Sequence, residues 1–273
     1  RFWGLREDRT ADHLGEDIVA SLPQESILLL SRDTPLFISQ YVRYALGFRA
    51  DVKLLHANRL WGADYPATIR LRFPELAVPE SEPGKFALAF VVANRDGYPI
   101  YTNTTFPLDE GWFWVQQGLV YRLTPKDSLP SLASFLAEND TLWNGFHDPR
   151  QGILSRYHHL MLSDVLSTYA DVRIAVGKTL LRGGKLTQAK RYFREALAYK
   201  SDIEEQDGYT YLGLAELFDN HCDEALAAFA KAREVSLVPD VSLTLYESVA
   251  YRDACKNKEK AEELMRVYEA SRG

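Results

Sequence analysis

The segment "SRDTPLFISQYVRYALGFRADVKLL", residues 31–55, decides the fold of the first half of the chain. A short apolar run, residues 26–30, leads into it. Pro35 then lies at the expected first position of a helix and Gly47 at its end, where helices commonly carry these two residue types. Residues 51–57, "DVKLLHA", read as a second strand. A strand, a helix and a second strand in this order predict a βαβ unit of a parallel sheet.

The first turn of this unit lacks the glycines of a phosphate-binding loop. G-x-G-x-x-G lets a dinucleotide approach the backbone, but here Asp33 and Thr34 precede Pro35. We expect one of these two side chains to cap the helix by accepting a hydrogen bond from a free N–H group. In the alternative reading, Asp33 faces a crevice and binds a sugar hydroxyl or a cation. Residues 56–58 and 102–105 should reach the same edge, where ligands of open α/β sheets bind.

The remainder of the first half alternates helical and extended patterns. This alternation predicts an α/β domain over residues 1–130, with a small, mostly parallel, Rossmann-like sheet between two helical layers. The expected helices cover residues 16–23, 65–74 and 83–97, and the expected strands cover residues 98–104 and 112–125. In one reading the last strand is entered through a hairpin.

Two tryptophans fall on the last of these strands. Side chains alternate along a strand, so Trp112 and Trp114 share one face. Their indoles could stack against sugar rings, which makes a glycan a candidate partner. They could equally cover a helix or pack the sheet onto the second half of the chain.

The second half repeats its small and aromatic residues every 36 positions. Gly177, Ala189, Phe193 and Ala196 recur as Gly213, Ala225, Phe229 and Ala232, and a degenerate third copy reads Val249, Ala261, Met265 and Tyr268. This pattern resembles the tetratricopeptide repeat, in which small residues let two helices approach and an aromatic fills the space between them. The change from mixed to purely helical patterns near residues 125–150 predicts a linker at residues 131–150. The resemblance implies that the repeat domain, residues 151–273, is a solenoid of six or seven helices between residues 151 and 271.

In such repeats the first helix of each unit lines a concave groove that binds a protein or peptide. Position within the repeat assigns seven residues to that groove: Lys178, Leu181, Arg182, Thr210, Leu214, Leu217 and Tyr246. The apolar members could instead pack against the first half of the chain.

Composition narrows the range of functions. The 273 residues suffice for two domains, and a net charge of −6 argues against a nucleic-acid partner. The longest apolar run, residues 86–93, is too short to cross a bilayer. Cys222 and Cys255 have no metal-ligand spacing, and we expect both to be free and reduced, which leaves the cellular compartment open.

The histidines predict no metal site. His13, His56, His147 and His221 are scattered along the sequence, and the adjacent pair at 158–159 would diverge on a helix. The sequence also lacks the motifs of a nucleophile with its base, a zinc protease or a Walker loop. We therefore expect no catalytic residue, no metal and no cofactor in this chain.

Three segments together resemble one family of membrane proteins: residues 8–55, "GYPIYTNT" (97–104) and "GLVYRLTP" (118–125). Their features include a helix ending in Leu-Pro, a strand with an Asp turn, and a Gly-x-Arg-x-Asp-Val strand entry. This order resembles the soluble region after the transmembrane helices of bacterial proteins related to protein O-mannosyltransferase-like glycosyltransferases. Two family features are absent here: a second acid in the turn, and a proline where Ala50 stands.

The resemblance implies a periplasmic or otherwise extracytoplasmic region, tethered by a membrane segment before residue 1. The opening "RFWGLRED" has no initiator Met and no signal-peptide pattern, as expected of an excised piece. Glycosyl transfer from a lipid-linked donor would belong to the membrane portion, so this region would be non-catalytic by itself. Its expected partners are its own transmembrane region and a protein or acceptor held by the repeats. The alternative is a structural protein–protein interaction module of a cell-envelope complex, whereas a self-contained sugar- or nucleotide-processing enzyme would need a catalytic motif that is missing.

Overall fold

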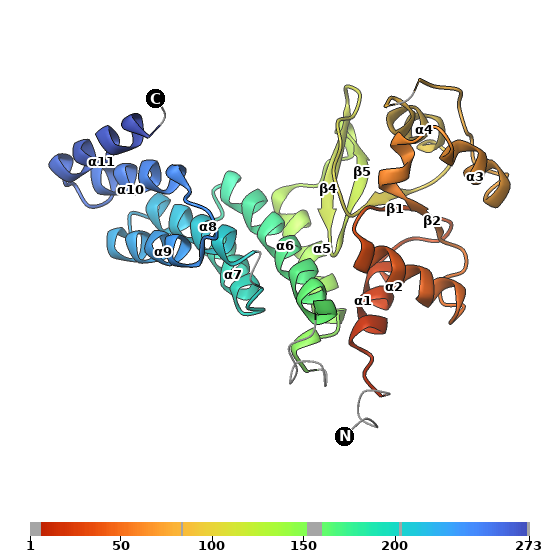
Figure 1. The fold of residues 1–273 in the computed structure, drawn as a ribbon, viewed down its shortest axis with the longest axis horizontal. Helices are drawn as coiled ribbons and strands as arrows, with labels where there is room; N and C mark the ends of the chain where they lie inside the picture. The colour runs from red at the N-terminus through yellow and green to blue at the C-terminus, as the bar shows by residue number, and fades with distance from the viewer. Residues whose placement is uncertain (1–6, 83, 152–159, 202–203, 272–273) are drawn as a thin grey trace. The chain divides into compact units, whose positions relative to one another are not determined.

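The computed structural model describes residues 7–82, 84–151, 160–201 and 204–271 (Figure 1). It divides into two compact units, Arg1–Val165 and Leu166–Gly273. The division falls within helix α6 (Leu160–Arg182), whereas the sequence predicted a linker at residues 131–150. In the described residues, no helix is both long and apolar enough to span a bilayer.

The first unit is built on a small mixed sheet of five strands in the order β2-β1-β3-β5-β4. The strands are β1 (Ile27–Leu30), β2 (Lys53–His56), β3 (Ile100–Thr102), β4 (Trp112–Gln117) and β5 (Val120–Pro125). β1 pairs in parallel with β2 and with β3, whereas β5 pairs antiparallel with β3 and with β4. The prediction of a mostly parallel sheet therefore holds for the first three strands only.

The error lies in residues 112–125, for which the sequence predicted one strand. They form the β4–β5 hairpin, whose two strands pair from Trp112 with Pro125 to Gln117 with Val120. Gly118 starts the tight turn with a left-handed φ of 55°, a conformation that glycine adopts without steric cost. The turn lacks an Asn-Gly or Asp-Gly pair, and its local sequence signal is the glycine at the first of its two central positions, Gly118.

Helices cover both faces of the parallel strands. Figure 1 shows α1 (Thr10–Ala20) and α2 (Asp33–Tyr44) on one side, with α3 (Tyr65–Arg72) and α4 (Phe86–Asn94) on the other. All four residues of β1 are fully buried, as expected of a strand covered on both faces. The contact between α1 and α2 is close because Gly15 has no side chain, and a Cβ there would lie 2.7 Å from Val42 Cγ2. The predicted helices at 65–74 and 83–97 are confirmed as α3 and α4.

The start of α2 differs from the prediction that Asp33 or Thr34 caps it. The N-cap residue is Arg32, and no side chain accepts a capping hydrogen bond. Pro35 is the third residue of the helix, so one of the two N–H groups that a cap normally satisfies does not exist. At the other end the helix stops at Tyr44, and Gly47 takes the expected left-handed conformation with φ 68°.

The strand entry after α2 holds the end of α1 in place. The Arg49 guanidinium donates to the carbonyls of Val19, Leu22 and Pro23 at 2.7–2.9 Å, and to both carboxylate oxygens of Asp51. Val19 lies in the last turn of α1 and Leu22 and Pro23 follow it, where carbonyls lack intrahelical donors. The hydrogen bonds from Arg49 hold the pKa of Asp51 well below its usual range.

Residues 131–150 contain α5 (Leu132–Gly145), which packs against β4. Asn139, fully buried, accepts a hydrogen bond from Gly118 N at 3.0 Å and donates to Gln116 O and Phe135 O. Its amide thus satisfies the backbone of the hairpin turn. This part of the expected linker belongs to the first unit.

The second unit consists of helices that pack on one another in sequence order. After α6 come α7 (Leu186–Leu197), α8 (Glu205–Phe218), α9 (Cys222–Val235), α10 (Val241–Asp253) and α11 (Lys258–Ala270). Within the described residues, the six helices agree with the predicted six or seven.

The same glycine–phenylalanine contact occurs twice in this unit. A Cβ at Gly177 would lie 2.5 Å from the Phe193 ring, and a Cβ at Gly213 would lie 2.5 Å from the Phe229 ring. Both phenylalanines are fully buried. The two glycines therefore let successive helices approach closely at equivalent places, as the 36-residue pattern predicted.

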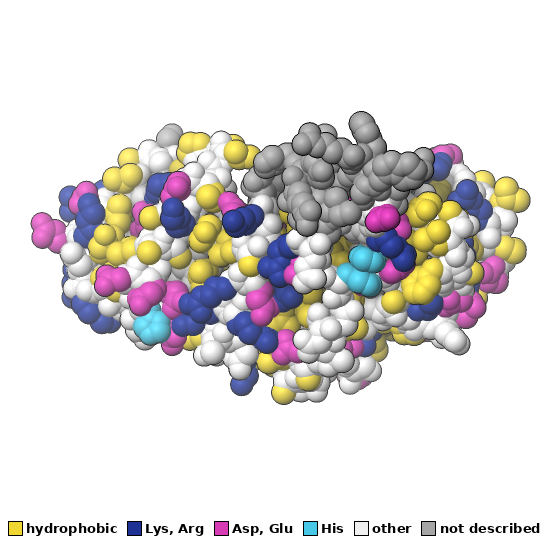
Figure 2. Space-filling view, turned by 90° about the horizontal axis from the view of Figure 1, so that it is seen from below, with side chains coloured by type: hydrophobic (Ala, Val, Ile, Leu, Met, Phe, Trp, Pro, Cys, Tyr) yellow, Lys and Arg dark blue, Asp and Glu magenta, His cyan; other side chains and the backbone are white. Residues whose placement is uncertain are grey.

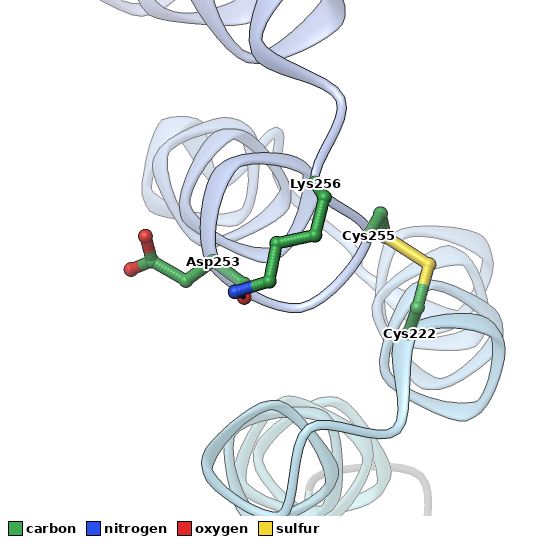
Figure 3. Close-up of a disulfide and its surroundings, with 4 residues drawn as sticks. All are labelled: Cys222, Asp253, Cys255 and Lys256. Atoms are coloured by element: carbon green, nitrogen blue, oxygen red, sulfur yellow. Dashed lines mark hydrogen bonds between the residues drawn. A yellow bond between two sulfur atoms is a disulfide. The ribbon is translucent and has the colours of Figure 1, made fainter.

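The two cysteines form a disulfide, contrary to the expectation that they are free. Figure 3 shows Cys222, the first residue of α9, joined to Cys255 just after α10, while Lys256 extends away toward Asp253. The half-cystines are 33 residues apart, close to one repeat length. They meet because α9 and α10 pack against each other, a tertiary effect that the cysteine spacing alone did not reveal.

Candidate functional site

The three polar stretches expected at the carboxyl edge of the parallel strands do meet. Asn103, after β3, accepts hydrogen bonds from Ser31 N at 2.8 Å and Ser31 Oγ at 3.1 Å. Asn58, after β2, donates to Ser31 O at 2.9 Å. These groups bond chiefly to one another and thereby link the loops after β1, β2 and β3.

Asp33 and Thr34 lie beside this edge. Asp33 is exposed in the first turn of α2, where a carboxylate interacts favourably with the helix dipole. Thr34 Oγ1 donates to Asp164 Oδ2 at 2.7 Å. The Thr34 hydroxyl is therefore engaged within the protein, while the Asp33 carboxylate reaches solvent.

Trp112 and Trp114 share one face of β4, as predicted, and both contact protein groups. The Arg95 guanidinium lies 4.5 Å from the Trp112 ring centroid and is held by Asp109 at 2.7 Å. Trp114 Nε1 donates to Phe106 O at 2.9 Å, and the two rings meet edge to face. Both indoles pack on the apolar core beside α3 and α4. Trp112 also lines a cavity of about 350 Å³.

The predicted groove residues of the second unit differ in how accessible they are. Thr210 and Leu217 are buried, and Leu214 and Tyr246 are partly buried against the core around Phe229. Lys178 forms an ion pair with Asp207 at 2.8 Å and lies over the Tyr211 ring, Leu181 is half-buried, and Arg182 is exposed. A ligand could therefore reach Arg182 without rearrangement, but not Thr210 or Leu217.

Phe218, at the end of α8, is a candidate site residue that the sequence did not predict. It occupies the repeat position of Arg182, 36 residues later, and is 58% exposed. The periodicity that assigned Arg182 to the groove would have assigned Phe218 as well. The two equivalent positions thus present a cation and an aromatic ring.

A buried charge network around Glu216, also on α8, is a second feature that sequence reasoning missed. The Glu216 carboxylate, 4% exposed, binds Lys190 Nζ at 2.9 Å, Arg194 Nη2 at 2.7 Å and His221 Nδ1 at 2.9 Å. Burial raises the pKa of Glu216, but the hydrogen bonds from His221 and Lys190 outweigh it and lower the pKa overall. Asp219 completes the network with a 2.6 Å contact to Lys190.

A second group that the sequence did not predict brings two distant histidines together in the first unit. His13 lies on α1 and His147 follows α5, yet their rings stack with centroids 3.9 Å apart and planes 8° apart. Asp17, buried on α1, accepts from His147 N at 2.9 Å and contacts His147 Nδ1 at 2.7 Å. Burial and the neighbouring His147 ring lower the pKa of His13.

Glu16 completes this histidine cluster. One side-chain ligand atom from each of His13, Glu16 and His147 lies within 4.8 Å of the other two. A cavity of about 370 Å³ adjoins the two rings, lined also by Arg9, Asp148 and other residues. Figure 2 shows histidine side chains reaching the surface among acidic and basic side chains in two separate places. The i, i+3 spacing of His13 and Glu16 on α1 was the available sequence signal.

Comparison of the chain with protein-family models, with curated proteins and with solved structures finds no match. The resemblance to the O-mannosyltransferase-like membrane proteins therefore stays a prediction. Residues 158 and 159, the adjacent histidines of the sequence, lie outside the described residues. The function must be argued from the geometry of the two units.

Proposed function

We propose that this chain is an extracytoplasmic, non-catalytic binding region of a membrane glycosyltransferase-like protein, whose helical repeats hold a protein partner or acceptor. The observation that carries the proposal is the duplicated glycine–phenylalanine contact, Gly177 with Phe193 and Gly213 with Phe229. Equivalent close contacts 36 residues apart are what a tetratricopeptide-like solenoid requires, and such solenoids present extended binding surfaces.

The disulfide supports the proposed location. Disulfides persist in oxidising compartments such as the bacterial periplasm and are rare in the reducing cytosol. Cys222 and Cys255 join two helices of the repeat half. An interaction surface exposed outside the cytosol would gain stability from such a cross-link.

The exposed side chains suggest how a partner would bind. Arg182 and Phe218 occupy equivalent positions at the ends of α6 and α8, and Lys178 lies nearby along α6. Arginine and aromatic residues contribute much of the energy of protein–protein interfaces. We infer a partner segment that offers a carboxylate to Arg182 and apolar surface to Phe218.

The loops at the sheet edge support a non-catalytic role for the first unit. Ser31, Asn58 and Asn103 bond to one another, so their polar atoms hold the loops together. A catalytic site instead directs such groups toward a substrate. In this proposal the sugar transfer itself takes place in the membrane portion of the protein.

Two measurements test the proposal. The isolated chain, mixed with a lipid-linked sugar donor and an acceptor protein, should transfer no sugar, and transfer by this chain alone would refute a non-catalytic role. In cells carrying the full-length protein, Arg182→Ala with Phe218→Ala should lower glycosylation of the captured partner. Arg266→Ala, on the last helix with 79% of its side chain exposed, is the matched control.

The same repeats also favour a second candidate, a structural interaction module of a cell-envelope complex. The two candidates differ in the fate of the partner once it is captured. If Arg182→Ala with Phe218→Ala reduces capture while the glycosylation state of the remaining captured partner is unchanged, the structural module is the better description.

A further inference from the structure

The histidine cluster of the first unit has the composition of a transition-metal site. Imidazole nitrogens and a carboxylate oxygen are the usual protein ligands of zinc when cysteine is absent. His13 and Glu16 come from one face of α1, and His147 comes from the segment after α5. One helix and a segment distant from it in sequence thus bring three ligand-type side chains to one place.

Asp17 prepares His147 for metal binding. Its buried carboxylate accepts a hydrogen bond from the backbone N of His147 and lies 2.7 Å from Nδ1. A carboxylate at this distance favours the tautomer with the proton on Nδ1, which leaves the lone pair on Nε2. Metal-ligating histidines commonly donate their other ring N–H to a carboxylate in this way.

Glu16 has one carboxylate oxygen available. Arg9 Nη2 donates to Oε1 of Glu16, which leaves Oε2 to coordinate an ion. A hydrogen bond to the second oxygen orients a ligating carboxylate, so this contact is compatible with coordination.

We propose that His13, His147 and Glu16 bind one divalent transition-metal ion, zinc being the best fit, with Asp17 as the residue that positions His147. Three protein ligands leave a fourth tetrahedral position for water or an added ligand, and the cavity of about 370 Å³ beside His13 and His147 offers the room for it. The site is independent of the repeat half and of the proposed partner binding.

Binding requires a change in ring orientation. The two imidazoles are nearly parallel, so their lone pairs do not yet converge on one point. His147 is fixed by Asp17, whereas His13 is half-buried at the helix surface. We therefore expect the His13 ring to turn about its side-chain torsions and to lose its stacking on His147 when the ion binds.

The other group of three potential ligands in the described residues is Glu216, Asp219 and His221. It fits a metal less well because Lys190 lies between both carboxylates and Arg194 holds the second oxygen of Glu216. A cation would have to displace these positive charges. In the histidine cluster of the first unit, by contrast, Arg9 contacts one oxygen of Glu16, so an ion could bind without displacing it.

Zinc titration of the chain, purified without a polyhistidine tag, tests the proposal. Wild type should bind one zinc ion per chain, and cobalt should give the visible absorption of a tetrahedral site. His13→Ala removes a ligand without touching the Asp17–His147 bonds and should weaken zinc binding at least 10-fold. Asp17→Asn should weaken it about 10- to 100-fold. His221→Ala, the control in the other cluster, should bind like wild type.

Unfolding gives a second readout that separates binding from misfolding. Zinc should raise the unfolding midpoint of the first unit in wild type and in His221→Ala, but not in His13→Ala, because a ligand of the folded state stabilises it. No zinc bound by a folded wild type at micromolar free metal would overturn the proposal. Binding unaffected by His13→Ala, or lost only in His221→Ala, would overturn it too.

Discussion

Arg49 makes more hydrogen bonds to distant backbone than any other side chain described in the first unit, and its removal gives the sharpest stability test. In Arg49→Ala the carbonyls of Val19, Leu22 and Pro23 lose their charged donor, and Asp51 loses both contacts to the guanidinium. Removing one partner of a buried ion pair costs about 3–5 kcal/mol. The Arg49 side chain is 19% exposed, so water replaces part of the loss, and we expect about 2–4 kcal/mol.

Tryptophan fluorescence can follow this change in the first unit alone. All five tryptophans lie within the first unit, so urea unfolding monitored by fluorescence reports on that unit. Far-UV circular dichroism follows the helices of both units in the same samples, so the part of its change that fluorescence does not follow reports on the second unit. The fluorescence transition should move to lower urea in Arg49→Ala, while the transition of the second unit should stay in place.

The pH dependence supplies an independent check. The pKa of Asp51 is lower in the folded chain than in the unfolded chain. Its contribution to stability is therefore fully present above the unfolded pKa of about 3.9, and it is lost as the pH falls through the folded pKa. The stability lost by wild type below about pH 4 should be smaller in Arg49→Ala, which lacks the interaction already at pH 7.

Arg49→Lys is the matched control for charge. Lysine keeps the positive charge but cannot reach three carbonyls and both oxygens of Asp51 together, so it should restore about half of the stability. A loss of stability below about 0.5 kcal/mol in Arg49→Ala, the size of an ordinary surface substitution, would refute the stabilising role of the Arg49 hydrogen bonds. Full stability in Arg49→Lys would show that charge matters and the forked geometry does not.

Three further predictions concern other parts of the chain. Reducing the Cys222–Cys255 disulfide, which closes a loop of 33 residues, should cost the second unit about 3–4 kcal/mol, measured by circular dichroism with the fluorescence transition unchanged. Gly213→Ala should lower the stability of that unit by about 1–3 kcal/mol, because the new Cβ would lie 2.5 Å from Phe229, whereas Gly145→Ala meets nothing within 4 Å and should be neutral. Asn139→Ala should cost the first unit about 1–3 kcal/mol in urea unfolding, because Gly118 N would be left without its partner; no loss would show that water replaces the amide.

Local sequence patterns identified much of the fold because they act over one or two turns. The apolar run of β1, the proline that follows α1 and the helical stretches of α3 and α4 are all read from neighbouring residues. The 36-residue pattern also succeeded, because Gly177 and Gly213 face the same kind of ring. The convergence of Ser31, Asn58 and Asn103 followed from the rule that parallel strands end at one edge.

The failures involve contacts between residues far apart in the chain. The His13–His147 stack depends on how α1 packs against the segment after α5, which no spacing reveals. The disulfide depends in the same way on the packing of α9 against α10. Helix capping by Asp33 or Thr34 failed for a local reason, since Pro35 removed one of the N–H groups to be capped.

The residues that carry the family resemblance have structural roles in the first unit. In the Gly-x-Arg-x-Asp-Val strand entry, Gly47 takes a left-handed conformation, Arg49 binds the end of α1, Asp51 holds Arg49, and Val52 is fully buried. A motif whose members all stabilise the fold can be shared by proteins that bind different ligands. In this chain the motif stabilises the first unit, and the proposed function has to be tested elsewhere, at Arg182 and Phe218 and at the histidine cluster.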